Sequence, residues 1–193
     1  MNLVYLVKMK AKILKRNKMI KTYPNYTEKI FNENILNDMG FKSFISTEIQ
    51  DNKLYKEFDC NKSIDGFLFD NNHNMEAFGI RHQFGIDYKS YTTRYVTKNK
   101  TLNTEYHKLN NAILTDGLKP KYLIHCFWSK KINGVLNSYG IVKTKDLIRY
   151  YNSLEELPKR INKIDGTIFL HASFKKVGKY FEPNINQLKL NIN

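Results

Sequence analysis

Short runs of apolar residues, separated by Asn, Gly and Pro, dominate the sequence and predict mainly strands. The runs are rich in β-branched and aromatic residues and cover 43–49, 63–70, 75–84, 89–96, 122–128, 135–142 and 167–174. The Asn-rich segment 71–74 predicts a turn that joins two of these strands into a hairpin. Asn133-Gly134 is a second hairpin turn, between the strands 122–128 and 135–142.

Four segments have the apolar spacing or the capping residues of helices: 26–39, 104–116, 144–151 and a segment that begins at Ser153. Gly40 ends the first in a left-handed conformation, and Thr104 caps the second. Ser153 with Glu156 three residues later forms a capping box. In chain order these segments run α-β-β-β-β-α-β and then β-α-α-β, which we interpret as an α-β-β-β-α-β core followed by a β-α-α-β extension. This order predicts an α/β (α+β) fold with a mixed β-sheet and flanking helices.

The 193 residues suit one domain, and no Pro/Gly/Ser-rich linker divides them. We therefore predict a single domain, 1–193. Its first part, 1–22, is an edge strand or a basic arm, because it carries seven basic side chains and no acidic one. Residues 26–128 form the core and 129–193 a C-terminal extension.

Lys and Arg total 32 against 18 acidic residues, which gives a net charge of +14. A positive field of this size favours polyanions, and DNA is the partner we expect. A competing explanation is AT-rich codon usage, because Lys, Asn, Ile and Tyr are all abundant. Arginine is scarce: five residues, Arg16, Arg81, Arg94, Arg149 and Arg160. In a chain that mostly uses lysine, an arginine indicates that the planar guanidinium and its two-pronged hydrogen bonding are needed at that position.

Membrane, secreted and zinc-binding classes find no support in the sequence. No apolar run approaches the ~20 residues of a membrane-spanning helix. The apolar start precedes the basic residues, the reverse of a signal peptide. Cys60 and Cys126 form no CxxC pair. We expect a cytoplasmic protein without membrane contact; a homodimer is left open.

The chemistry-bearing residues gather around the first hairpin. Ile64-Asp65-Gly66 opens its first strand, and Glu76-Ala77-Phe78 and Gly79-Ile80-Arg81 lie on its second. This arrangement resembles the PD-(D/E)XK (restriction-endonuclease-like) nuclease superfamily. In that family an Asp on one hairpin strand and a Glu-x-Lys pair on the next meet at a metal ion. The resemblance covers residues 26–128 and implies an αβββαβ core.

The second half of the motif departs from the family pattern. Glu76 has Phe78 where the Lys belongs, and Arg81 has Gly79 where the acid belongs. Strand parity places Asp65 on the same side as Arg81 and Gln83, and Glu76 on the other. In the family the Lys can be replaced by Gln or another polar residue, and the acid can move to the following helix.

The resemblance implies catalytic roles for Asp65, Gln83, Arg81 and Glu105, with Glu105 supplied by the following helix. Mg²⁺ or Mn²⁺ would be held by Asp65 with Glu105 or Glu76. The plainer interpretations are that Asp65 is a turn residue at a strand end and that Glu105 and Lys108 are ordinary first-turn helix residues. Asp59 is a second candidate acid.

Phosphate contacts are expected from the next strand and helix. Thr92 and Arg94 point the same way on the strand 89–96, and a hydroxyl beside an Arg fork suits a phosphate oxygen. Lys89 at the start of that strand and Lys108 on the helix complete the predicted nucleic-acid-binding set. A solvent-facing strand is the plainer alternative.

We therefore expect a metal-dependent DNA endonuclease of restriction, repair or phage type. The alternative is a catalytically inactive protein of the same fold that binds DNA or a protein partner. An RNA-binding or phage accessory protein unrelated to nucleases is the third class.

Overall fold

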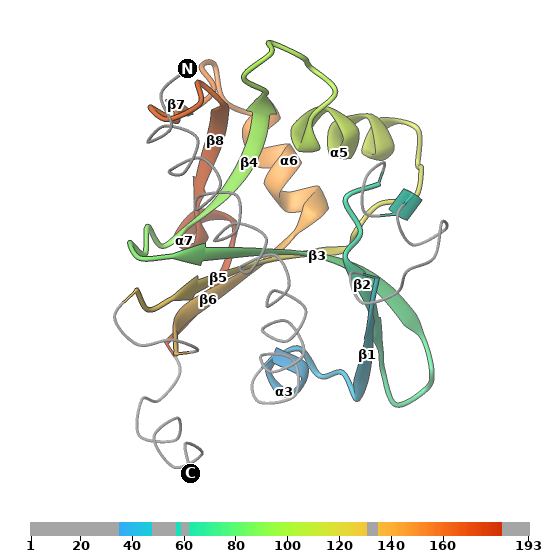
Figure 1. Cartoon of the computed structure of the whole chain (residues 1–193). Helices are drawn as coiled ribbons and strands as arrows, with labels where there is room; N and C mark the ends of the chain where they lie inside the picture. The colour runs from blue at the N-terminus through green and yellow to red at the C-terminus, as the bar shows by residue number, and fades with distance from the viewer. Residues whose placement is uncertain (1–34, 48–56, 59–61, 131–134, 183–193) are drawn as a thin grey trace, which may run out of the picture.

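The computed structural model describes residues 35–47, 57–58, 62–130 and 135–182 (Figure 1). In chain order the elements are α3 (Leu36–Met39), β1 (Ser43–Ser46), β2 (Gly66–Phe69), β3 (Met75–Phe84), β4 (Ser90–Val96), α5 (Glu105–Leu114), β5 (Tyr122–Trp128), β6 (Leu136–Lys143), α6 (Thr144–Asn152), β7 (Lys159–Ile161), β8 (Ile168–Ser173), α7 (Phe174–Val177) and β9 (Gly178–Phe181). The predicted arm 1–22, most of the predicted helix 26–39 and Asp59 lie outside the described residues.

Six strands form a large mixed sheet in the order β1-β2-β3-β5-β6-β9. Only one of its neighbouring pairs, β3 with β5, is parallel. Parallel neighbours need a crossover connection, and here the chain passes through β4 and α5 between them. The predicted mixed α/β class with a mixed sheet and flanking helices is confirmed.

The remaining strands form a second sheet in the order β4-β8-β7, which corrects the expectation of a single sheet. Figure 1 shows β4 and β8 rising from the large sheet on the side where α5 and α6 lie. The strand character of 90–96 was predicted, but its partner is β8, far along the sequence. Residue patterns predict that a strand forms and leave its long-range partner open.

The first hairpin is present as predicted. β2 and β3 pair antiparallel with Gly66 opposite Phe78. The Asp70 carboxylate organises the turn, because it accepts hydrogen bonds from the backbone N–H groups of Asn72 (2.8 Å) and Asn74 (2.9 Å). The same register brings Asp65 next to Gly79, at the end of β2 that faces away from the turn.

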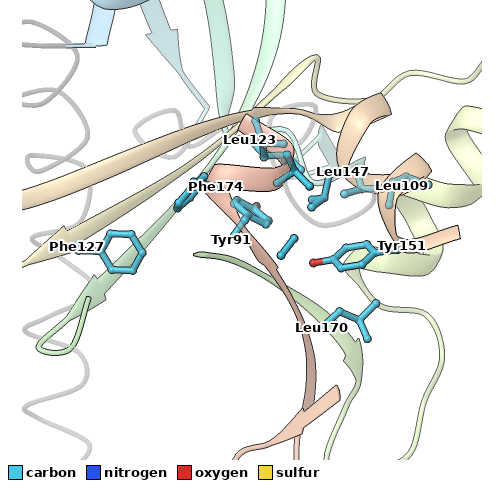
Figure 2. Packing of buried hydrophobic residues seen from close by; sticks show 12 residues of the cluster. Tyr91, Leu109, Leu123, Phe127, Leu147, Tyr151, Leu170 and Phe174 are labelled. Carbon is cyan, nitrogen blue, oxygen red and sulfur yellow. The ribbon is translucent and has the colours of Figure 1, made fainter. Parts of the chain in front are cut away.

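A hydrophobic core covers each face of the large sheet. On the α3 side, the fully buried members include Leu68, Phe78, Ile124 and Trp128. On the other side, β4, β8, α5, α6 and α7 pack against the sheet through Tyr91, Leu109, Leu123, Phe127, Leu147, Tyr151, Leu170 and Phe174 (Figure 2). This second core fixes the small sheet and α5 relative to β3.

The predicted helix at Ser153 is wrong, and so is the β-α-α-β order of the C-terminal extension. Ser153 instead ends α6: its N–H donates to the Arg149 carbonyl (3.0 Å) and its Oγ to the Tyr150 carbonyl (2.8 Å). Pro158 explains the failure, because in the second turn of a helix it removes an N–H donor and clashes with a preceding carbonyl. After β6 the observed order is α6, β7, β8, α7 and β9.

Within the described residues, no helix is both long enough and apolar enough to cross a membrane.

A half-buried histidine makes the stability of the fold depend on pH. The Trp128 Nε1–H donates to His82 Nδ1 at 3.0 Å. This hydrogen bond requires that Nδ1 carries no proton, as in the neutral imidazole. Burial lowers the pKa of His82 from 6.5 to about 4. Because the unfolded chain binds this proton at higher pH than the folded chain, folding stability decreases as pH falls from about 6.5 to 4.

The free energy of unfolding that the protein loses between pH 7 and pH 4 is the quantity of interest. We predict that His82→Asn makes this loss smaller by at most about 3 kcal/mol, the equivalent of the pKa shift. Urea unfolding at a series of pH values between 7 and 4 measures it. His73→Asn, on the exposed hairpin turn, is the matched control and leaves the dependence unchanged. An unaltered pH dependence in His82→Asn would contradict the prediction.

Candidate functional site

A polar pocket of about 390 Å³ opens where the β2–β3 hairpin, the free edge of β4 and the start of α5 meet. It combines three basic side chains and two carboxylates with neutral polar and apolar groups. Its lining residues are Ser63, Asp65, Gly79, Ile80, Arg81, Tyr91, Arg94, Thr97, Asn103, Thr104, Glu105, Lys108 and Leu123. Five of the sequence-predicted site residues are therefore brought together from β3, β4, α5 and the residue that precedes β2.

Asp65 is held at the pocket by the backbone on both sides of it. Its N–H donates to the Phe78 carbonyl (2.8 Å), and its carbonyl accepts from the Thr47 N–H (2.8 Å). Its carboxylate Oδ2 accepts a hydrogen bond of 2.6 Å from the Ile80 N–H. The side chain is thus fixed between two strands, more constrained than the plain turn residue that the sequence also allowed.

Gly79, opposite Asp65, leaves no room for an acid at this position. A Cβ placed there would lie 2.9 Å from the Ser63 carbonyl oxygen and 3.0 Å from a Leu123 methyl group. Contact with a backbone carbonyl at that distance requires the strand itself to shift. Position 79 therefore requires glycine, because the backbone at Ser63 approaches it too closely for a side chain.

An ion pair between Arg81 and Glu105 crosses the pocket. Arg81 Nη2 donates to Glu105 Oε2 at 2.5 Å, and Arg81 Nη1 donates to Thr92 Oγ1 at 3.2 Å. The two charged side chains are 24% and 12% exposed, so little solvent competes with them. Although burial opposes the charge, the Glu105 carboxylate raises the pKa of Arg81.

Glu105 also accepts hydrogen bonds from β4. The Tyr91 hydroxyl donates to Oε1 (2.9 Å), and the backbone N–H of Arg94 donates to Oε2 (3.1 Å). The second bond satisfies an N–H on the free edge of the small sheet. Burial and the neighbouring Glu105 carboxylate raise the pKa of Tyr91, so its phenol remains a donor. Both carboxylate oxygens of Glu105 therefore accept hydrogen bonds from protein donors.

Two of the predicted phosphate contacts line this pocket, and a third contacts one of its lining residues. Arg94 and Lys108 line it, and the Arg94 side chain is exposed. Thr92 is buried and accepts from Arg81, so it orients the guanidinium rather than facing solvent. The sequence predicted a hydroxyl beside an arginine on a single strand. The structure instead pairs the Thr92 hydroxyl of β4 with Arg81 of β3.

The structure places three other predicted residues elsewhere. Glu76 has the opposite strand parity from Arg81 and pairs with Lys121. Gln83 follows Arg81 on β3, but its Nε2 donates to the Ile86 carbonyl (2.7 Å) outside the pocket. Lys89 forms an exposed ion pair with Glu182 (2.9 Å).

A divalent metal ion does not fit this arrangement of side chains. Mg²⁺ needs carboxylate oxygens that point at it, and those of Glu105 face Arg81, Tyr91 and the Arg94 N–H. A cation at Glu105 would also meet the Arg81 charge. Across the described ranges, no group of three or more His, Cys, Asp or Glu side chains is placed to hold a metal.

The sequence pattern missed Tyr91 and the polar residues Thr97 and Asn103, which precede α5. Tyr91 alternates with Thr92, so strand parity places it on the face opposite the predicted phosphate contacts. Its hydroxyl reaches Glu105 because β4 is an edge strand beside α5. Thr104 is not the predicted side-chain cap: its Oγ1 donates to the Tyr95 carbonyl (2.8 Å).

No protein-family model matches this sequence, and no curated protein matches it significantly.

We predict that Glu105→Gln lowers the free energy of unfolding by about 2–4 kcal/mol, because it leaves the largely buried Arg81 charge without its counter-charge. Glu76→Gln is the matched control: its partner Lys121 is 48% exposed, so the loss stays below about 1 kcal/mol. Chemical unfolding of both variants measures the difference. Equal losses would show that the Arg81–Glu105 pair is no more important than a surface ion pair.

Proposed function

We propose that this chain is a nuclease-fold protein that binds DNA through the pocket and does not cleave it. The observation that carries the proposal is the engagement of Glu105 by Arg81, Tyr91 and the Arg94 N–H. The carboxylate that would complete a metal site instead positions a guanidinium. The pocket then acts through its positive charge.

The order and pairing of the elements support the nuclease-like part of the proposal. α3, β1, β2, β3, α5 and β5 follow the α-β-β-β-α-β order that the resemblance implies, with β4 added between β3 and α5. Asp65, immediately before β2, and Arg81 on β3 line one pocket, as do Glu105 and Lys108 on α5. Asp65 corresponds to the first acid of the motif, Arg81 to its basic residue and Glu105 to an acid supplied by the following helix.

The chemistry of the pocket suits a phosphate group. Arg94 and Lys108 supply positive charge, and Asn103 and Thr97 supply neutral hydrogen-bonding groups beside them. The Arg81 guanidinium is already oriented by Thr92 and Glu105, so little side-chain freedom is lost when it meets an anion. The net charge of +14 adds long-range attraction for a polyanion.

The second candidate is the metal-dependent endonuclease that the resemblance implies. It is favoured by one observation: Asp65 and Glu105, from separate elements, line the same pocket. This function requires Arg81 to leave Glu105 so that the carboxylate becomes available. A cleavage assay therefore separates the two candidates.

We predict that the affinity for duplex DNA falls steeply with salt, because bound phosphates release counterions. Arg94→Ala and Lys108→Ala each weaken binding and lower the slope of log affinity against log salt by about one. Fluorescence anisotropy with a labelled duplex at several salt concentrations measures this slope. Arg149→Ala, an exposed arginine of α6 outside the pocket, is the control for loss of charge alone. The pocket proposal fails if all three variants behave alike.

We predict that the purified protein leaves single-stranded, duplex and branched DNA intact in the presence of Mg²⁺ or Mn²⁺. Asp65→Ala binds DNA equally well or more tightly, because it removes a negative charge near the phosphates. Asp116→Ala, whose side chain is 96% exposed outside the pocket, is the control for this substitution. Cleavage by the unmodified protein that Asp65→Ala abolishes would establish the second candidate instead.

A further inference from the structure

The outer face of the small sheet carries a row of arginine and aromatic side chains. Arg94 of β4 lies directly opposite Phe169 of β8, and Arg160 of β7 lies opposite Phe169 from the other side. Directly opposed residues in antiparallel strands share a face of the sheet. Two arginines therefore flank one half-buried aromatic ring.

Two further contacts extend this row. The Arg160 guanidinium lies 5.9 Å from the ring centre of Tyr88, and the Arg81 guanidinium lies 5.9 Å from that of Phe169. Tyr88 is 47% exposed, and Arg160 is also exposed. We name Tyr88, Arg94, Arg160 and Phe169 the arginine–aromatic row. It runs from Tyr88 to the pocket, which it joins through Arg81 and Arg94.

The opposite face of the same sheet is committed to the core. Leu170 and Ala172 of β8 are buried with Tyr91 beneath α5 and α6. Thr93 is also buried, and its hydroxyl is 3.2 Å from that of Tyr151. Strand alternation leaves Arg94, Phe169 and Arg160 on the face away from this core, and Tyr88 lies beside Arg160. The residues of the inner face are explained by packing in the core. The arginine and aromatic residues of the outer face are not explained by that packing.

Arginine usage makes this composition specific. The chain has 32 basic residues, of which five are arginine. Three of those five, Arg81, Arg94 and Arg160, surround Phe169. A purely electrostatic surface is served equally well by lysine, which supplies 27 of the 32 basic residues. A planar guanidinium beside an aromatic ring adds stacking and fork-shaped hydrogen bonding.

We propose that the arginine–aromatic row binds unpaired nucleotides of DNA, whose bases stack on its aromatic and guanidinium groups while the adjoining pocket holds phosphate. This inference rests on the proposed function and names its substrate class: DNA with single-stranded or locally opened segments. Duplex bases are already stacked on one another and offer no free face. Aromatic side chains on an open sheet are a recurrent platform for unpaired bases.

The test compares single-stranded and duplex DNA with variants of the row. The probe is a labelled mixed-sequence strand of about 20 nucleotides, long enough to span a site of this kind, alone or annealed to its complement. Tyr88→Leu is the main variant, because Tyr88 is exposed and lies outside the pocket. Arg160→Lys keeps the charge and removes the planar fork, and Arg149→Lys on α6 is its matched control.

Tyr88→Leu is expected to weaken single-strand binding roughly five- to 150-fold, the equivalent of losing one base–aromatic stack. Duplex affinity changes less than about twofold, because phosphate contacts do not need the ring. Arg160→Lys follows the same pattern and Arg149→Lys changes neither affinity. Phe169→Leu weakens single-strand binding as a second, independent variant. Fluorescence of the buried Trp128 verifies that each variant is folded.

Two failures are distinguishable. If Tyr88→Leu and Phe169→Leu leave single-strand affinity within twofold of the unmodified protein, or weaken both probes equally, the row is only internal packing and the inference is overturned. If the unmodified protein binds neither probe at low salt, the proposed function itself fails, and the inference with it.

Discussion

The contact on which the site depends is the ion pair between Arg81 and Glu105. It joins the large sheet to the first turn of α5, and through Tyr91 and the Arg94 N–H it also holds the edge of β4. A charged pair that is largely shielded from water is destabilising unless its geometry is good and its remaining hydrogen-bonding capacity is used. Thr92, Tyr91 and the Arg94 N–H meet that requirement. The positions of three elements are thereby coupled to one interaction.

The same ion pair decides what the pocket can do. A carboxylate surrounded by a guanidinium, a phenol and an N–H is an anchor for donors rather than a ligand for Mg²⁺. Gly79 excludes a replacement acid because the Ser63 carbonyl lies too close. Asp65 then remains as the other carboxylate among the pocket's lining residues, which also include three basic side chains. The balance of charge favours an anionic ligand over a metal ion.

Local patterns were sufficient to predict many of the site residues. Strand parity placed Asp65 and Arg81 on one side of the hairpin and Glu76 on the other, and helix position singled out Glu105 and Lys108. The pairing of Arg81 with Glu105 was beyond reach, because it joins residues 24 positions apart across a crossover. The partnership of β4 with β8 is equally non-local, so Phe169 could not be connected with Arg94. Pro158 was the local signal that should have excluded a helix at Ser153.

Arginine placement connects the pocket with the outer face of the small sheet. Arg81 contributes to both, because its guanidinium binds Glu105 and lies beside the Phe169 ring. Arg94 also contributes to both, since its N–H binds Glu105 while its side chain shares a face with Phe169. Lysine offers a single flexible ammonium and cannot make a fork-shaped hydrogen bond and a ring contact at once. Of the 32 basic residues five are arginine, and three of these gather around Phe169, where a planar guanidinium can make fork-shaped hydrogen bonds and stack on a ring.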